Sequence, residues 1–222
     1  MDAIAKFKDL CIDANDPALL GRFWASVLDR TWEPDEAGEG RLTGPTPQHT
    51  IWINRVPEPK TVKHRVHLDI YGTGPAEGSR VVLPEGDDRR WTIMADPEGG
   101  EYCLFQRDEL PADRLHGLVV DSVDPAAQGE WWAAVYGAEV GYSKDDEAST
   151  VENVPGMPML TMDFVRVPEP KTVKNRIHWD VDVDDLDRLV EAGAVVLRLP
   201  GENRRWTVMA DPEGNEFCAF TV

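Results

Sequence analysis

Hydrophobic and polar positions change their spacing several times along the chain, and the changes predict where helices and strands lie. Over residues 17–29 the apolar side chains recur every three or four positions, as on one face of an amphipathic helix. Asn15 or Asp16 is placed to cap this helix, and Pro17 suits its first position. Residues 6–14 alternate in part, and short apolar runs follow the helix between Pro- and Gly-rich turns. The opening of the chain therefore predicts one strand, one helix and three short strands.

The same order of elements is predicted three more times. In residues 65–106 the strand patterns are present, but the sequence GTGPAEG at 72–78 stands where a helix is expected. Helical patterns return at 125–136 and at 185–192, each between predicted strands. The chain is therefore predicted to contain four βαβββ units, the second with a reduced helix.

Two long segments of the sequence occur twice. The nine residues RVPEPKTVK stand at 55–63 and again at 166–174. RRWTIMADPEG at 89–99 returns as RRWTVMADPEG at 204–214. A repeat of this length indicates one structural unit written twice.

The two copies predict two domains of the α+β class. The charged, proline-containing segment at 107–114 separates them, so the boundary is placed near residue 110. We therefore expect domain 1 at 1–110 and domain 2 at 111–222, each with two βαβββ units. Internal pairing of four units favours a monomer, and a homodimer is the alternative.

The amino-acid composition argues against some classes of binding partner. The chain has 222 residues, 23 Lys and Arg, 41 Asp and Glu, and a formal net charge of −18. This balance argues against nucleic acid or an anionic membrane as partner, because both require a basic surface. An odd cysteine count, no secretory leader and no long apolar run predict a cytoplasmic protein. The sequence also lacks GxGxxG, Walker, CxxC and GxSxG motifs, so nucleotide, zinc-ribbon and α/β-hydrolase functions have no support.

Three motifs carry a resemblance to a known family. The first helix of each copy has Asp-Pro with a tryptophan eight residues after the aspartate. VPEPKxxKxRxHxD follows, and each copy ends in W-T-[IV]-M-ADPEG[GN]E[YF]C. Together they resemble the vicinal oxygen chelate superfamily, which includes glyoxalase I, bleomycin-resistance proteins and extradiol dioxygenases, and most closely its glyoxalase-like branch. The resemblance implies tandem glyoxalase-like domains, each built of two βαβββ modules that form a curved, incomplete barrel around a ligand-binding cup. It leaves the function open, because one scaffold hosts many chemistries.

The resemblance also implies where metal ligands would stand, on the first and last strand of each module. In the first copy these positions hold Asp9, Trp52, His67 and Cys103. In the second copy they hold Gly117 or its neighbour His116, Asp163, His178 and Cys218. Neither set matches the His/Glu/His/Glu pattern that the family implies for glyoxalase I.

One possible metal set remains in the second copy. His116, Asp163 and His178 approximate a site of two histidines and one carboxylate. His116 is one residue out of register, however, and such a slip points a strand side chain to the opposite face. We therefore expect no metal cofactor, with a divalent metal as the alternative. Without metal, His67 and His178 are expected to be hydrogen-bonded polar residues inside the cups.

Other residues are candidates for contact with a ligand. Trp52, Trp91 and Trp206 lie on predicted strands, where an aromatic face can stack on a flat apolar molecule or pack in the core. Asp163 and the equivalent cysteines Cys103 and Cys218 are placed with them, the cysteines as buried side chains and not as nucleophiles.

The repeated basic residues allow two interpretations. They form either a basic rim for an anionic ligand or ion pairs with Glu58, Glu98, Glu169 and Glu213. We favour ion pairs.

Two functional hypotheses follow. The first is a metal-free protein that binds a small, apolar or aromatic molecule in its cup, in the manner of bleomycin-resistance proteins. The alternative is a lyase, isomerase or dioxygenase that holds a divalent metal through His178 or His67 and polarises a substrate oxygen. Metal-free acid–base catalysis by His67 or His178 is a third possibility.

Overall fold

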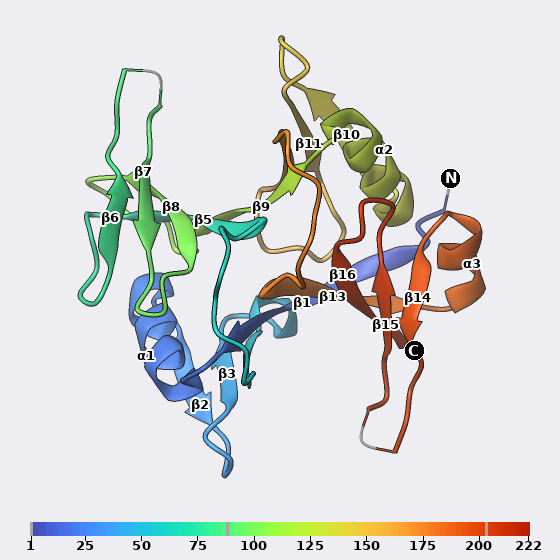
Figure 1. Cartoon of the computed structure of the whole chain (residues 1–222), viewed down its shortest axis with the longest axis horizontal. Coiled ribbons are helices and arrows are strands. Elements are labelled where there is room, and N and C mark those ends of the chain that lie inside the picture. Colours follow the sequence, from blue (N-terminus) through green and yellow to red (C-terminus); the bar gives the residue numbers. More distant parts are fainter. Residues whose placement is uncertain (1, 88, 203) are drawn as a thin grey trace.

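The computed structural model describes residues 2–87, 89–202 and 204–222. Its elements fall into four groups along the chain (Figure 1). The first group contains β1 (Ala5–Ala14), α1 (Pro17–Leu28), β2 (Thr31–Pro34), β3 (Gly40–Thr43), a 3-10 turn (Pro47–His49) and β4 (Ile51–Arg55). The second contains β5 (Val66–Gly72), β6 (Arg80–Leu83), β7 (Thr92–Ala95) and β8 (Glu101–Gln106).

The second copy repeats this order. Its first group contains β9 (Leu115–Ser122), α2 (Pro125–Tyr136), β10 (Glu139–Tyr142), β11 (Ala148–Glu152) and β12 (Thr161–Arg166). Its second contains β13 (Ile177–Val183), α3 (Leu186–Glu191), β14 (Val195–Arg198), β15 (Thr207–Ala210) and β16 (Glu216–Thr221). The four predicted units are therefore confirmed, including the missing helix between β5 and β6. In the described ranges no helix is long and apolar enough to cross a membrane.

The strands form two open sheets of eight strands. Sheet A has the order β14-β15-β16-β13-β1-β4-β3-β2, and sheet B has the order β10-β11-β12-β9-β5-β8-β7-β6. The α+β class is as predicted. Figure 1 shows the red C-terminal strands on the same sheet as the blue N-terminal strand β1, which lies in the middle of sheet A.

Each sheet joins one module from each sequence copy. β1 pairs antiparallel with β13, with Leu10 opposite Trp179, and β5 pairs antiparallel with β9. Sheet A therefore combines the first and last modules of the chain, and sheet B combines the two middle ones. The segment 107–114, where the boundary between copies was placed, connects β8 to β9 inside sheet B. A sequence repeat shows which modules are related, but it does not show which of them pair.

The helices cover one face of each sheet. In α1 and α2 the Asp16 and Asp124 carboxylates accept hydrogen bonds from the backbone, and a proline opens each helix. Asp16 is one of the two caps predicted for α1, and Pro17 opens that helix as predicted. Trp24, Trp132 and Trp179 are almost completely buried in a hydrophobic cluster that includes residues of both sheets. Strand alternation then leaves the other face of each sheet for polar and aromatic side chains.

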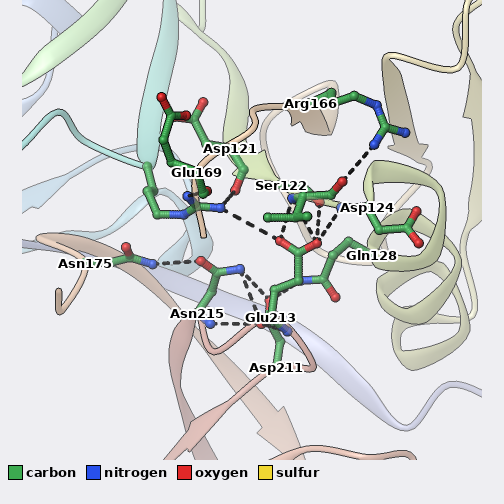
Figure 2. Close-up of polar contacts among 12 residues, drawn as sticks. Asp121, Ser122, Asp124, Gln128, Arg166, Glu169, Asn175, Asp211, Glu213 and Asn215 are labelled. Atoms are coloured by element: carbon green, nitrogen blue, oxygen red, sulfur yellow. Dashed lines mark hydrogen bonds and ion pairs between the residues drawn. The ribbon is translucent and has the colours of Figure 1, made fainter. Parts of the chain in front are cut away.

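The repeated DPEG turns fasten the two sheets together. Each closes a hairpin, with Gly99 and Gly214 at φ 84° and 85°, a backbone conformation that glycine adopts without strain. Glu213, in the turn between β15 and β16, accepts hydrogen bonds from Ser122 Oγ at 2.8 Å and from the Asp124 backbone N–H at 2.7 Å (Figure 2). Glu98 does the same for the start of α1, accepting from the Asp16 N–H at 2.6 Å.

Ion pairing of the repeated basic residues is also observed. Arg176 lies 3.1 Å from Glu98, and Arg65 lies 3.9 Å from Glu213. The predicted partners Glu58 and Glu169 contribute backbone carbonyls to the same two guanidinium groups, at 2.8 Å and 2.7 Å. Arg65 and Arg176 therefore join the two sheets, whereas the repeated lysines pair with carboxylates of a single sheet, as Lys60 does with Glu101.

Candidate functional site

A cavity of about 610 Å³ lies on one face of sheet A. This face is opposite the one whose side chains point into the core. We call this space cup A. Its strands come from both ends of the chain, so no single copy of the repeat could form it. The lining residues are Lys8, Cys11, Glu33, Pro34, Asp35, Glu39, Gly40, Arg41, Trp52, Asn54, Asp180, Trp206, Cys218 and Phe220.

The floor of cup A is formed by β1, β13 and β16. The Cys11 thiol lies 3.8 Å from both carboxyl oxygens of Asp180. His178 Nε2 lies 3.9 Å from Asp180 Oδ1, and the two side chains are 13% and 5% exposed. Cys218 is the neighbour of Asp180 on β16. Four hydrogen-bonding groups thus meet in a nearly dry environment.

Burial keeps this floor neutral. Burial lowers the pKa of His178 to about 4, so its imidazole is uncharged near neutral pH. Burial, together with the charge of Asp9, raises the pKa of Asp180 well above its ordinary value. Burial also raises the pKa of the Cys11 and Cys218 thiols. Neither thiol is therefore poised to act as a nucleophile, as the sequence led us to expect.

Aromatic rings form the walls of cup A. Trp206 stacks on Phe220, with ring centroids 5.4 Å apart and an interplanar angle of 27°. On the other side, Trp52 donates its indole N–H to Asp9 at 3.2 Å, which holds the ring in place. Lys8 also contacts Asp9, at 2.5 Å, and its ammonium lies 4.4 Å from the centroid of Phe220. Trp52, Trp206 and Cys218, predicted as ligand contacts, all line this cup.

Cup B is the corresponding face of sheet B. His67 Nε2 lies 3.5 Å from Cys103 Sγ and 3.5 Å from Asp69 Oδ1. Burial lowers the pKa of His67 to about 3 and raises that of Asp69 to about 7. Asp163, on β12, accepts hydrogen bonds from Thr150 at 2.6 Å and from Thr161 at 2.7 Å. His67, Cys103 and Asp163 therefore share cup B.

His116 faces cup B, contrary to the prediction that its register would turn it away. The pairing of β5 with β9 shifts between Asp69 opposite Gly117 and Ile70 opposite Leu115, so His116 is the extra residue of a β-bulge. Its Nδ1 lies 3.1 Å from the Tyr71 hydroxyl. A one-residue shift turns a side chain to the opposite face only where the strand is regular. The strand is not regular here, because the bulge adds one residue, and His116 therefore points into cup B.

The predicted metal set of His116, Asp163 and His178 is not assembled. His116 and Asp163 lie on sheet B, whereas His178 lies on sheet A. The set was drawn from one sequence copy, and the crossed pairing of modules separates its members. The fold therefore does not support the alternative of an ion held by these three residues together.

Two other clusters bring metal-binding atoms together. Cys11, His178 and Asp180 form one in cup A, and His67, Asp69 and Cys103 form one in cup B, each with ligand atoms within 4.8 Å of one another. Thiolate, imidazole and carboxylate suit zinc better than magnesium. An ion would have to displace protons from the thiol and the carboxyl, because the dry floor favours their neutral forms.

Sequence reasoning missed the two aspartates of these clusters, although a signal for them was present. The repeated His-x-Asp motif, at 67–69 and 178–180, places both side chains on one face of a strand. No sequence signal marked Cys11 as part of the cluster in cup A, because it lies next to His178 only through the pairing of β1 with β13.

Comparisons with known proteins agree with this architecture. The family model described as "Glyoxalase-like domain" matches residues 9–105 and 117–220. Glyoxalase I from Zea mays is similar in fold, with a TM-score of 0.66 and 12% identity over 98% of this chain and 92% of that one. A putative dioxygenase from Bacillus subtilis has a TM-score of 0.66 and 13% identity over 100% of this chain and 86% of that one. No curated protein matches the sequence.

Proposed function

Because the chain belongs to the glyoxalase-like domain family, we propose that it binds a small, flat, apolar or aromatic molecule in cup A. The cavity of about 610 Å³ is the observation that carries the proposal. Ligand sites of small molecules commonly measure about 300–1,000 Å³ and combine apolar walls with a few polar groups.

The side chains of cup A suit such a ligand. Trp206 and Phe220 present a stacked aromatic wall, and Trp52 presents another ring opposite. The floor adds the Asp180 carboxyl and the Cys11 and Cys218 thiols, whose pKa values are raised by burial, so that their neutral forms are favoured. A flat ring with one polar substituent would place its faces against the tryptophans and its substituent toward Asp180.

Fluorescence titration with N-phenyl-1-naphthylamine, a neutral planar probe, tests the proposal. We expect Trp206→Ala to raise the Kd at least about tenfold, because it removes the larger part of one wall. Trp91→Ala is the matched control, since Trp91 is the repeat counterpart of Trp206 in the other cup, and it should leave the Kd unchanged. Wild-type protein that does not bind the probe, or equal losses in both variants, would contradict the proposal.

A metal-dependent lyase, isomerase or dioxygenase is the second candidate, because three metal-binding side chains converge in cup A. Cys11, His178 and Asp180 would hold the ion, which when bound would polarise a substrate oxygen as a Lewis acid. Trp52 and Trp206 would then orient the substrate over that floor.

Elemental analysis of protein purified without chelator decides between the two candidates. Stoichiometric metal that His178→Ala removes would favour the metalloenzyme. His67→Ala, its repeat counterpart, shows whether cup B holds an ion as well. Metal-free protein that still binds the probe would favour the binding function.

A further inference from the structure

The two cups are built from corresponding residues. His178 opposite Cys11 in cup A corresponds to His67 opposite Val119 in cup B. The same pairings contain a bulge in each sheet, whose extra residue is Lys8 in sheet A and His116 in sheet B. Side chains can therefore be compared between the cups position by position.

In cup B, aromatic side chains continue across the floor. Trp91 stacks on Phe105 at 5.5 Å, and Phe105 meets His116 edge to face at 5.2 Å. His116 then lies 4.7 Å from the ring of Tyr71 and 3.1 Å from its hydroxyl. The Arg107 guanidinium lies 5.1 Å from the centroid of the Tyr71 ring. Four rings therefore follow one another across this face of sheet B, each in contact with the next.

In cup A the same succession stops after two rings. Trp206 stacks on Phe220 as Trp91 does on Phe105, at 5.4 Å. The counterpart of His116 is Lys8, whose ammonium contacts Asp9 and lies 4.4 Å from the centroid of Phe220, so no third ring follows. The counterpart of Tyr71 is Asp182. The cavity of about 610 Å³ borders this end of the stack.

We propose that cup A alone takes a ligand and that cup B is closed by its own side chains, with two positions deciding the difference. These positions hold Lys8 and Asp182 in cup A and His116 and Tyr71 in cup B. The inference rests on the proposed function, and it adds that each chain binds one molecule. A ligand in cup B would have to part the Tyr71–His116 hydrogen bond and two ring contacts before it gained any contact of its own.

Exchange of the deciding residues tests the inference. At protein concentrations above the Kd, wild-type protein should bind one N-phenyl-1-naphthylamine per chain. The double variant His116→Lys, Tyr71→Asp gives cup B the residues of cup A and should bind a second equivalent. The reverse variant Lys8→His, Asp182→Tyr should weaken binding at least tenfold. Circular dichroism and melting curves establish that each variant is folded.

Two equivalents bound by wild-type protein would overturn the inference and leave the proposed function standing. A folded cup-B variant that still binds one equivalent would also overturn it.

Crystals soaked in phenol give a measurement that does not depend on the dye. Phenol in cup A alone supports the inference, because it shows one aromatic ligand bound per chain and none in cup B. Phenol between Tyr71 and Phe105, or phenol in neither cup, overturns the inference.

Discussion

At the scale of single residues, the two copies fill one equivalent pair of buried positions with different side chains. In the second copy, Asn175 donates to Asn215 at 3.0 Å, and Asn215 donates to Asp211 at 3.0 Å (Figure 2). The first copy has His64 and Gly100 at the positions of the two asparagines. A Cβ atom on Gly100 would lie 2.7 Å from His64 Cε1, so the imidazole occupies the room that the missing side chain leaves.

This exchange predicts a strong coupling between the two positions. Gly100→Asn alone should destabilise the protein by about 2 kcal/mol, because the new side chain overpacks against the ring. Adding His64→Asn should recover most of that loss by restoring the asparagine pair of the second copy. Urea denaturation of the wild type, both single variants and the double variant measures the coupling. Additive effects of the two substitutions would show that the positions are independent.

His64 should also make the stability of the protein depend on pH. Burial lowers the pKa of His64 from its ordinary value of 6.5 to about 4. Between these values the unfolded chain binds the proton and the folded chain does not, so His64 makes the protein less stable as pH falls. The wild type should therefore lose stability relative to His64→Asn between pH 6.5 and pH 4.5, by at most about 1.4 kcal/mol per pH unit. A gain in that range would contradict the buried, neutral imidazole.

At the scale of elements, a turn in one sheet caps a helix on the other. Glu213 accepts hydrogen bonds from Ser122 Oγ and from the backbone N–H groups of Val123 and Asp124, at 2.7–3.1 Å. These donors lie where β9 ends and α2 begins, and such N–H groups have no partner within the helix. A turn motif of four residues therefore positions a module of the other sheet.

Removal of this carboxylate should cost stability. We expect Glu213→Ala to lower the free energy of unfolding by about 2 kcal/mol or more, because three donors lose a charged acceptor. Glu213→Gln should cost less, since the amide oxygen can still accept. Glu36→Ala, at an exposed position, is the matched control and should stay within about 0.5 kcal/mol of wild type. Equal losses for Glu213→Ala and Glu36→Ala in urea denaturation would refute the role of the turn.

At the scale of the whole molecule, the crossed pairing makes the two copies depend on each other. Each sheet takes four strands from each copy. The floor of cup A, with Cys11 from the first copy and His178 from the second, exists only when β1 and β13 are paired.

Separated copies should therefore not behave as independent domains. A fragment of residues 1–110 should exist as a dimer, because an unpaired β1 and its apolar face need a first strand from another module. Mixing it with a fragment of residues 111–222 should yield a one-to-one complex that binds the probe. Light scattering after size exclusion measures both masses. A stable, cooperatively folding monomer of residues 1–110 would contradict the dependence.

The sequence by itself determined the elements and their grouping into modules. Apolar spacing and capping residues such as Asp16 and Asp124 act locally, so α1 and α2 could be placed from neighbouring residues alone. The repeat established that four related modules exist, and the motifs identified the fold. His67, His178, Trp52 and Trp206 could be named as candidates because each is marked by its own position in a motif or strand.

Only the tertiary structure decided which modules pair, and with that which residues meet. Related first strands present equivalent edges, so nothing local distinguishes β13 from β5 as the partner of β1. Strand pairing and register bring Cys11 next to His178 and keep His178 apart from His116. They also produce the bulge that points His116 into cup B. Whether a cup stays open depends on side chains of distant segments filling the same volume, and that is a property of the packed molecule.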